Sequence, residues 1–369
     1  MKATRILSVT SAWIAAVLTS VPVLADSGWP HSVATLTEAR DRVTAVTVGE
    51  KALFAGGWNF SPSSVVDIYD SAKNTWTAAQ LSQARYAMAG AATADGKAMF
   101  AGGFRSSTWS NTVDVYDPAT GTWSSDSLSL ARRWLAATTV GTKTMFAGGN
   151  GSGIAATNIV DIYDVSSNTW STASLSQARY GLNATTVGHL AMFAGGNRGS
   201  SKFSDVVDIY DAATDKWSVA KLAQARQWPV AVTVGTKAVF AGGFTGSTNY
   251  STVVDIFDSV SGNWSTATLP QGGEELDGAA VGHIAMFSGT SYRSDAVYVL
   301  DLDTMQWSQE VLSHKRGWLG AAGVDNRLLF AGGYDGTGFL DTVDIYLIPE
   351  PATLTLLALG GLLALRRPR

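Results

Sequence analysis

The sequence feature that most constrains the fold is a short apolar stretch that recurs along nearly the whole chain. It ends in Phe-Ala-Gly-Gly in six copies and in Phe-Ser-Gly-Thr in one. The seven phenylalanines are Phe54, Phe100, Phe146, Phe193, Phe240, Phe287 and Phe330, with spacings of 46, 46, 47, 47, 47 and 43 residues. A fixed period of roughly 20 to 50 residues indicates a repeat protein in which each copy is one supersecondary unit.

Each copy predicts four short strands. In the third copy, a small-residue run at 136–140 is followed by a glycine-containing turn, and 144–147 form a second strand before the double glycine. A variable loop leads to a third strand at 160–163, and a turn leads to a fourth around Trp170. Such turns are typical of hairpins, so we expect an antiparallel meander. A polar link at 175–179 begins the next copy.

The third and fourth strands carry a Tyr and a Trp with six residues between them. The pairs are Tyr69 and Trp76, Tyr116 and Trp123, Tyr163 and Trp170, and Tyr210 and Trp217, with Phe257 or Leu300 replacing Tyr before Trp264 and Trp307. This pattern, together with the double glycine, resembles the kelch repeat over residues 29–346. The resemblance implies the blades of a β-propeller.

The number of blades follows from counting strands. There are seven glycine strands and seven third strands, but only six fourth-strand tryptophans follow the first double glycine. The unmatched Trp29 lies at the N-terminus, before the first complete copy. We therefore predict an all-β, seven-bladed kelch-type propeller in which the N-terminal segment, with Trp29 at the tryptophan position, supplies the last blade's fourth strand and closes the ring.

Both ends of the chain read as processing segments. Residues 1–25 have a basic start, an apolar run and a small-residue site at Val23-Leu24-Ala25, as in a signal peptide, with a membrane anchor as the alternative. Residues 349–369 resemble the PEP-CTERM sorting signal of bacteria, in the order Pro349-Glu350-Pro351, short apolar run, and Arg366, Arg367 and Arg369. A simple anchor is again the alternative.

The resemblance implies export through the secretion machinery and processing by an exosortase-type enzyme, with transient membrane contact through the C-terminal segment. We expect the propeller to occupy residues 26–348 and to be located in the cell envelope, at the surface or outside the cell. The net charge is −4, and excluding the basic end segments leaves the propeller more acidic, which argues against nucleic-acid binding.

One face of the predicted ring carries many aromatic side chains. In a four-stranded meander, the loops between second and third strands lie on the same face as the links between copies. Variable loops on a rigid scaffold often carry function, and exposed aromatic rings stack on sugars and anchor protein partners. The binding residues predicted here are Trp58, Trp109, Trp134, Trp228, Trp318, Tyr86 and Tyr180. The alternative is that several of these rings pack against neighbouring loops.

An arginine precedes the first strand in six copies, and the same six copies carry an aspartate in the third strand. The sixth copy has Gly273 and Tyr298 instead. Joint loss predicts a buried ion pair within each blade, because an unpaired buried charge is costly. The predicted pairs are Arg40–Asp67, Arg85–Asp114, Arg132–Asp161, Arg179–Asp208, Arg226–Asp255 and Arg316–Asp344. An anion site at the channel entrance is the alternative.

The sixth copy also has acids, Glu274 and Glu275, in its link, while Trp228 and Trp318 occupy the links on either side. We expect any local site to lie here, with neutral divergence of one copy as the alternative. A carbohydrate-active enzyme resembling the kelch-type mutarotases or the sialidases would use Glu274 or Glu275 in proton transfer.

Other chemistries find little support. A copper site like that of galactose oxidase needs a Cys–Tyr crosslink, and this chain has no cysteine and only four scattered histidines. Asp301-Leu302-Asp303 offers too few oxygen ligands for a calcium site. We therefore expect no metal and no cofactor, and a non-catalytic propeller that binds an envelope or biofilm polysaccharide or protein through its loop face. The enzyme remains the alternative.

Overall fold

The computed structural model describes residues 28–247, 249–273, 276–288 and 294–348. Within these ranges the regular elements are all β-strands, and none of the described segments forms an apolar helix long enough to cross a membrane. The predicted signal segment 1–25, the sorting segment 349–369, and Glu274 and Glu275 lie outside the described residues.

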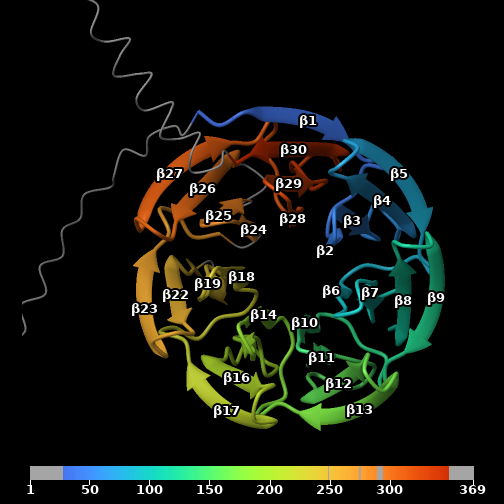
Figure 1. The fold of residues 1–369 in the computed structure, drawn as a ribbon, viewed down its shortest axis with the longest axis vertical. Coiled ribbons are helices and arrows are strands. Elements are labelled where there is room, and N and C mark those ends of the chain that lie inside the picture. The colour runs from blue at the N-terminus through green and yellow to red at the C-terminus, as the bar shows by residue number, and fades with distance from the viewer. Residues whose placement is uncertain (1–27, 248, 274–275, 289–293, 349–369) are drawn as a thin grey trace, which may run out of the picture.

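Seven antiparallel four-stranded sheets surround a central axis (Figure 1), which confirms the predicted seven-bladed propeller. Blade one contains β2 (Thr44–Val48), β3 (Lys51–Ala55), β4 (Val65–Asp70) and β5 (Thr75–Gln80). Blade two contains β6 (Ala89–Ala92), β7 (Ala98–Ala101), β8 (Thr112–Asp117) and β9 (Thr122–Ser127). Blade three contains β10 (Ala136–Val140), β11 (Lys143–Ala147), β12 (Ile159–Asp164) and β13 (Thr169–Ser174).

The remaining blades repeat this order from the axis outward. Blade four contains β14 (Asn183–Val187), β15 (Leu190–Ala194), β16 (Val206–Asp211) and β17 (Lys216–Lys221). Blade five contains β18 (Val230–Val234), β19 (Lys237–Ala241), β22 (Val253–Asp258) and β23 (Asn263–Thr268), with a small hairpin of β20 (Phe244–Gly246) and β21 (Asn249–Tyr250) in its loop. Blade six contains β24 (Asp277–Val281), β25 (Ile284–Ser288), β26 (Ala296–Asp301) and β27 (Gln306–Val311).

Blade seven joins the two ends of the propeller. It contains β28 (Gly320–Val324), β29 (Arg327–Ala331) and β30 (Thr342–Leu347), and its outer strand is β1 (His31–Thr35) (Figure 1). The strand closure is as predicted, but the position assigned to Trp29 was wrong. His31, not Trp29, pairs with Tyr346, where other blades pair Tyr with Trp.

Trp29 precedes β1 and still packs into the apolar cluster between blades six and seven. It lies two residues before His31, and alternate residues of an extended chain project to the same side, which explains how both can approach one interface.

The core consists of apolar layers between neighbouring blades. At the joint of blades seven and one, Phe54 and Tyr69 are fully buried in a cluster with Ala331 and Val343 of blade seven, and Trp76 covers it from outside. Burying one such aromatic side chain contributes about 1.5–3 kcal/mol. The Phe, Tyr and Trp of the repeat therefore join successive blades, which explains how a chain without disulfides holds the ring together.

The double glycine permits a close approach between blades. Gly56 and Gly57 have φ values of +60° and +113°. A Cβ atom would lie 2.4 Å from the carbonyl oxygen of Arg85 at Gly56, and 2.5 Å from that of Asp41 at Gly57. The Gly57 N–H also donates to the Arg85 carbonyl, so the glycine pair contacts the next link through its backbone.

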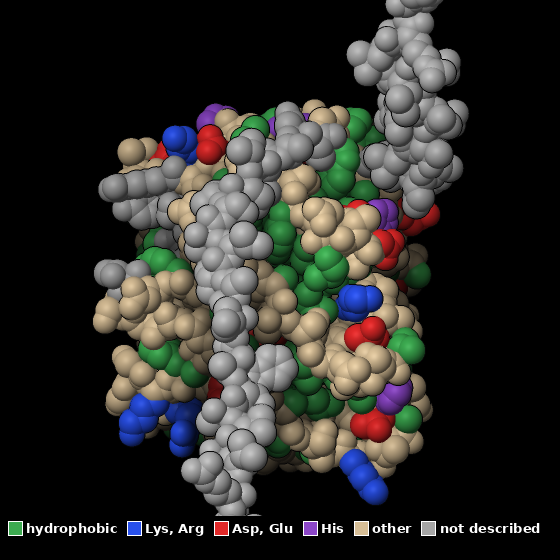
Figure 2. Space-filling view, turned by 90° about the vertical axis from the view of Figure 1, so that its left-hand side faces the viewer, with side chains coloured by type: hydrophobic (Ala, Val, Ile, Leu, Met, Phe, Trp, Pro, Cys, Tyr) green, Lys and Arg blue, Asp and Glu red, His purple; other side chains and the backbone are tan. Residues whose placement is uncertain are grey.

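The side of the ring is formed by the fourth strands, which are rich in serine and threonine. In β5, β9, β13, β17 and β23 the side chains are mostly exposed and the tryptophan is half-buried, whereas most side chains of β27 are half-buried or buried. The side seen in Figure 2 is accordingly mostly uncharged, with scattered acidic and basic groups.

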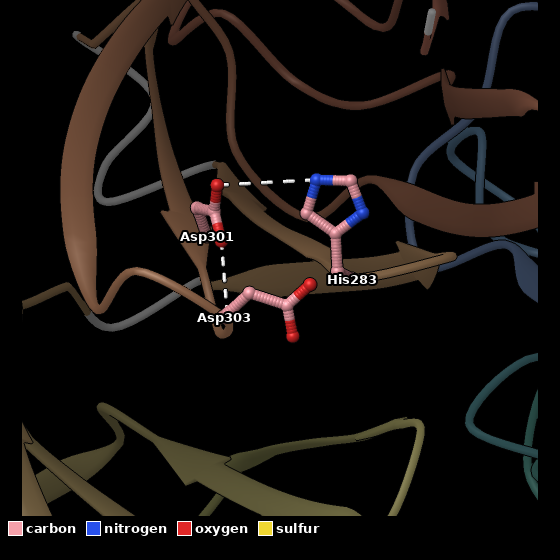
Figure 3. A group of neighbouring side chains, drawn as sticks. All are labelled: His283, Asp301 and Asp303. Carbon is pink, nitrogen blue, oxygen red and sulfur yellow. Dashed lines mark hydrogen bonds and ion pairs between the residues drawn. The ribbon is translucent and has the colours of Figure 1, made fainter. Parts of the chain in front are cut away.

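The turns between first and second strands, and between third and fourth strands, form one face of the ring. On this turn face, His283, Asp301 and Asp303 place potential ligand atoms within 4.8 Å of one another (Figure 3). The Asp301 carboxylate also accepts the backbone N–H groups of Asp303 and Thr304, at 2.9 and 3.0 Å. This carboxylate therefore already closes a turn.

Blade four repeats part of this arrangement. His189 Nε2 lies 3.6 Å from Asp211 Oδ1, while Ala213 occupies the position of Asp303. The His–Asp pairing is thus a feature of the turn in two blades, whereas blade four has no acid at the position of Asp303.

Candidate functional site

A buried arginine fixes each of six links on the opposite face, which we term the loop face. The Nη–Oδ distances are 2.7 Å for Arg40–Asp67, 2.5 Å for Arg85–Asp114, 2.6 Å for Arg132–Asp161, 2.6 Å for Arg226–Asp255 and 2.5 Å for Arg316–Asp344, and Arg179 pairs with Asp208 in the same way. All six guanidinium groups are fully buried. They are therefore not available to a ligand at the channel entrance.

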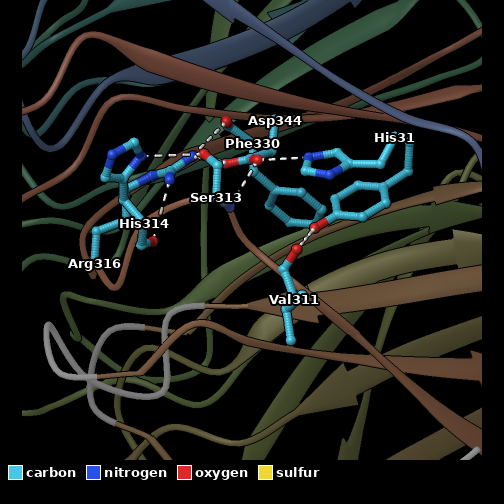
Figure 4. Close-up of polar contacts among 8 residues, drawn as sticks. His31, Val311, Ser313, His314, Arg316, Phe330 and Asp344 are labelled. Atoms are coloured by element: carbon cyan, nitrogen blue, oxygen red, sulfur yellow. Dashed lines mark hydrogen bonds and ion pairs between the residues drawn. The ribbon is translucent and has the colours of Figure 1, made fainter. Parts of the chain in front are cut away.

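The ion pairs also hold the backbone of the link. In blade two, Arg85 donates to the carbonyl oxygen of Phe100, and Asp114 accepts the N–H of Ser82. Burial lowers the pKa of Arg85 to about 10, while Asp114 opposes this shift, so the guanidinium stays charged at neutral pH. Figure 4 shows the blade-seven pair, in which Asp344 joins Arg316, Ser313 and His31.

Blade six replaces the ion pair with neutral groups. Tyr298 occupies the aspartate position, and its hydroxyl donates to Gln271 Oε1 at 3.2 Å. Gly273 occupies the arginine position. The joint replacement leaves no unpaired charge at this site in the blade.

The residue two positions after each arginine faces the axis with a left-handed backbone. The described members of this group, which we term the rim residues, are Arg42, Ala87, Trp134, Gly181, Trp228 and Trp318, with φ between 51° and 61°. Backbone N–H groups donate from Arg42 to Trp318, from Trp134 to Ala87, from Gly181 to Trp134 and from Trp228 to Gly181, at 2.7–3.0 Å. Main-chain hydrogen bonds thus run from blade to blade around the rim.

Three of the rim residues are tryptophans in a strained conformation. Trp134, Trp228 and Trp318 have φ values of 53–54°. The left-handed region costs a non-glycine residue about 1–2 kcal/mol, and it is rare for a bulky side chain. Strain of this kind accumulates where a side chain is needed in a particular place. The three indoles are therefore the strongest functional signal on this face.

The rim residues enclose a pocket of about 500 Å³ at the mouth of the channel, which we term the funnel. It is lined by Arg42, Tyr86, Ala87, Trp134, Leu182, Asn183, Trp228, Pro229, Leu276, Asp277, Trp318 and Leu319. A second cavity of about 350 Å³ shares Asn183 and Asp277 and continues inward along the first strands. The funnel is large enough for a small ligand or for the end of a polymer chain.

Aromatic contacts hold the indoles in position. Trp134 stacks on Tyr180 with centroids 5.5 Å apart, and it meets Trp228 edge-on at 6.2 Å. The Arg133 guanidinium lies 3.9 Å from the centroid of Trp134, and Trp318 stacks on Tyr334 at 6.1 Å. Trp134 and Trp318 are thus held by neighbouring rings and guanidinium groups, whereas Trp228 is 37% exposed and can meet a ligand.

Arg42 is the cation among the described funnel-lining residues, and it already contacts aromatic rings and a neighbouring carboxylate. Its guanidinium lies 4.5 Å from the Trp318 ring centroid and 6.0 Å from that of Tyr86. Its Nη1 is 3.6 Å from Asp41 Oδ1. Burial raises the pKa of Asp41 to about 6, and Arg42 opposes that shift.

Asp277 is the acid of the funnel. It is the first residue of β24, half-buried, and it lines both cavities. Its carboxylate accepts the N–H of Gly278 at 2.8 Å. Burial raises the pKa of Asp277 to about 7, while backbone N–H groups of Gly278 and Ala321 oppose the shift.

The structure divides the aromatic residues predicted from sequence into two sets. Tyr86, Trp134, Trp228 and Trp318 line the funnel. Trp58 and Tyr180 contact the lining rings of Tyr86 and Trp134, whereas Trp109 contacts Phe104, which in turn packs on Tyr86. The sequence prediction did not include Arg42, Asn183 or Asp277. Aligning the copies at the arginine position would have found them. Arg42 lies two residues after that position in its copy, and Asn183 and Asp277 lie four residues after it in theirs.

Comparison with known families agrees with this geometry. The KLHDC2/KLHL20/DRC7 Kelch-repeats domain matches residues 134–333, and the Kelch motif matches residues 39–80 and 85–126. A search of curated proteins found no significant match. The first family match covers more than half of the chain, and seven four-stranded blades account for the described residues. The chain belongs to the kelch-repeat family.

Proposed function

We propose that this protein is a non-catalytic binding propeller that holds a polysaccharide or protein partner at the funnel. Kelch propellers typically serve as interaction scaffolds. The observation that carries the proposal is the group of three tryptophans, each kept in a strained backbone conformation at the rim. Arg42 and Ala87 share this conformation, so it belongs to the rim position, and the functional signal is that three such positions carry a bulky indole that is rare there.

The proposed setting is outside a bacterial cell. It rests on the two end segments, whose sequences resemble a signal peptide and a PEP-CTERM sorting signal. The partner would then be a polymer of the envelope or of the biofilm matrix. The location can be tested by fractionating cells that express the full chain with and without residues 349–369 and probing each fraction for the protein.

Binding can be tested with an exopolysaccharide pull-down and a glycan array. We expect Trp228→Ala and Trp318→Ala to reduce binding at least tenfold, since indole anchors dominate such sites. Phe60→Ala is the matched control, because Phe60 is 83% exposed and does not line the funnel. Equal losses in all three variants would contradict the assignment of the site to the funnel.

The carboxyl group of Asp277 is the observation that favours the second candidate, a carbohydrate-active enzyme. A pKa near neutral pH suits a group that transfers protons. Asp277 is nevertheless the one acid among the described funnel-lining residues, whereas glycoside hydrolysis generally uses a pair of carboxyl groups. Turnover of a sugar substrate that is abolished by Asp277→Asn would replace the binding proposal with the enzyme.

A further inference from the structure

Asp277 is chemically isolated in the channel wall. The seven innermost strands, β2, β6, β10, β14, β18, β24 and β28, are fully described, and Asp277 is the one ionisable residue among them. The equivalent first residues of the neighbouring blades are Val230 and Gly320, which are neutral. A carboxylate at this position is thus not required by the repeat.

The carboxylate also lacks a cationic partner among the described residues. No described Lys, Arg or His forms an ion pair with Asp277, and its acceptor atoms are served by the backbone N–H groups of Gly278 and Ala321. Arg42, the other charged group of the funnel, is stacked on Trp318 and lies beside Asp41. A half-buried carboxylate without a cation is costly, and a bound cation would remove that cost.

The surroundings of Asp277 suit a cation attached to an apolar ring. Trp228 and Trp318 belong to the blades on either side of blade six, and both line the same funnel as Asp277. Indole faces attract cations and stack on the apolar faces of sugar rings. Trp318 already carries Arg42, so the site offers the exposed indole of Trp228 as an aromatic platform and Asp277 as an acceptor of charge.

We propose that the funnel recognises the ammonium group of a deacetylated amino sugar in a polysaccharide, with Asp277 as the charge partner and Trp228 as the stacking platform. This inference rests on the proposed binding function and specifies its ligand. The binding free energy comes from stacking, and the ion pair selects free amino groups over acetylated ones.

The main chain of the rim favours a sugar over a peptide. Extended peptides are commonly recognised by main-chain hydrogen bonds to an exposed strand edge. At the rim, the N–H groups of Arg42, Trp134, Gly181 and Trp228 are already bonded to neighbouring blades. These four groups are therefore not available to a peptide, whereas sugars are bound mainly by ring faces and polar side chains.

The test uses the purified full-length protein and two probes, a β-1,4-linked glucosamine hexamer and its fully N-acetylated counterpart. Affinities are measured by calorimetry at pH 7. We expect the glucosamine hexamer to bind at least tenfold more tightly, and Asp277→Asn to remove that preference without changing the affinity for the acetylated hexamer. Asp303→Asn, the same substitution on the turn face, is the matched control and should retain the preference.

Equal affinities for both hexamers, or a preference that survives Asp277→Asn, would overturn this inference and leave the proposed binding function intact. A lysine-containing peptide that binds through Asp277 more tightly than the glucosamine hexamer would overturn the assignment to a polysaccharide. The proposed function itself fails if no polysaccharide or protein binds in a manner that depends on Trp228 or Trp318.

Discussion

His31 stacks on Tyr346 with ring centroids 4.7 Å apart and planes 10° from parallel, where four other blades pair a tyrosine with a tryptophan. Its Nε2 also lies 2.6 Å from Asp344 Oδ1. We expect His31→Ala to lower the free energy of unfolding by about 2 kcal/mol, because it removes a ring contact and a hydrogen bond at the closure.

His31→Trp tests the same joint from the opposite direction. It restores the aromatic residue found in the other outer strands, so we expect a melting temperature at or near that of the parent protein. His314→Ala is the control, since His314 is exposed. Melting temperatures are measured by circular dichroism. Equal melting temperatures for His31→Ala and His314→Ala would refute the stabilising role of His31 at the closing strand.

The Arg85–Asp114 ion pair can be exchanged for the neutral arrangement of blade six. Asp114→Asn alone should destabilise the protein by about 3–5 kcal/mol, because it leaves a buried guanidinium without its partner. The double variant Arg85→Gly with Asp114→Tyr reproduces Gly273 and Tyr298, and Gln83 already occupies the position of Gln271. We expect this double variant to be more stable than Asp114→Asn in urea unfolding.

Glycine is usually a more destabilising substitution than alanine, but the positive φ at Trp228 should reverse this order of stability. Glycine adopts this conformation without strain, and Gly181 shows that the rim accepts it. Trp228→Gly should therefore be as stable as Trp228→Ala or more stable, by up to about 1 kcal/mol, although both lose ligand binding. A clearly less stable glycine variant, measured by chemical unfolding, would show that the backbone at this position is not strained.

Asp277 makes stability depend on pH in a defined direction. The folded protein holds this proton up to about pH 7, whereas an aspartate in an unfolded chain loses it near pH 3.9. The folded state thus binds more protons between these values, and the contribution of Asp277 to stability falls as pH rises through this window. Asp277→Asn should raise the free energy of unfolding by about 2 kcal/mol at pH 8 and very little at pH 4.

Urea unfolding of the parent protein and of Asp277→Asn at pH 4, 6 and 8 measures this effect, because the two proteins have every other titratable group in common. A difference between the proteins that does not change with pH would mean that the Asp277 carboxyl has an ordinary pKa.

The fold could be predicted from sequence because every blade repeats the same residues for the same physical reason. The Phe of the glycine strand and the Tyr and Trp of the outer strands fill each joint between blades, and seven copies remove the ambiguity of one. The register of the closing strand could not be predicted. Trp29 and His31 lie two positions apart, and only the pairing of His31 with Tyr346 distinguishes between them.

The candidate site was predictable only in part. Tyr86, Trp134, Trp228 and Trp318 could be located because aromatic residues exceed what the repeat needs. Asp277 was harder to predict from the sequence. It stands out because the innermost strands of the other six blades carry no ionisable residue, and these strands come together only in the folded ring. Glu274 and Glu275, predicted beside it, lie outside the described residues and remain predictions.

The hydrogen-bonded rim has a consequence for how this protein can change over evolution. The bonds that join the rim residues use N–H and C=O groups that nearly every amino acid provides, so the described rim accepts Arg, Ala, Gly and Trp at equivalent positions. A substitution there changes what the funnel presents without breaking the bonds that shape it. Each of the six described rim positions can thus vary independently, and a new specificity can arise through single mutations, one blade at a time.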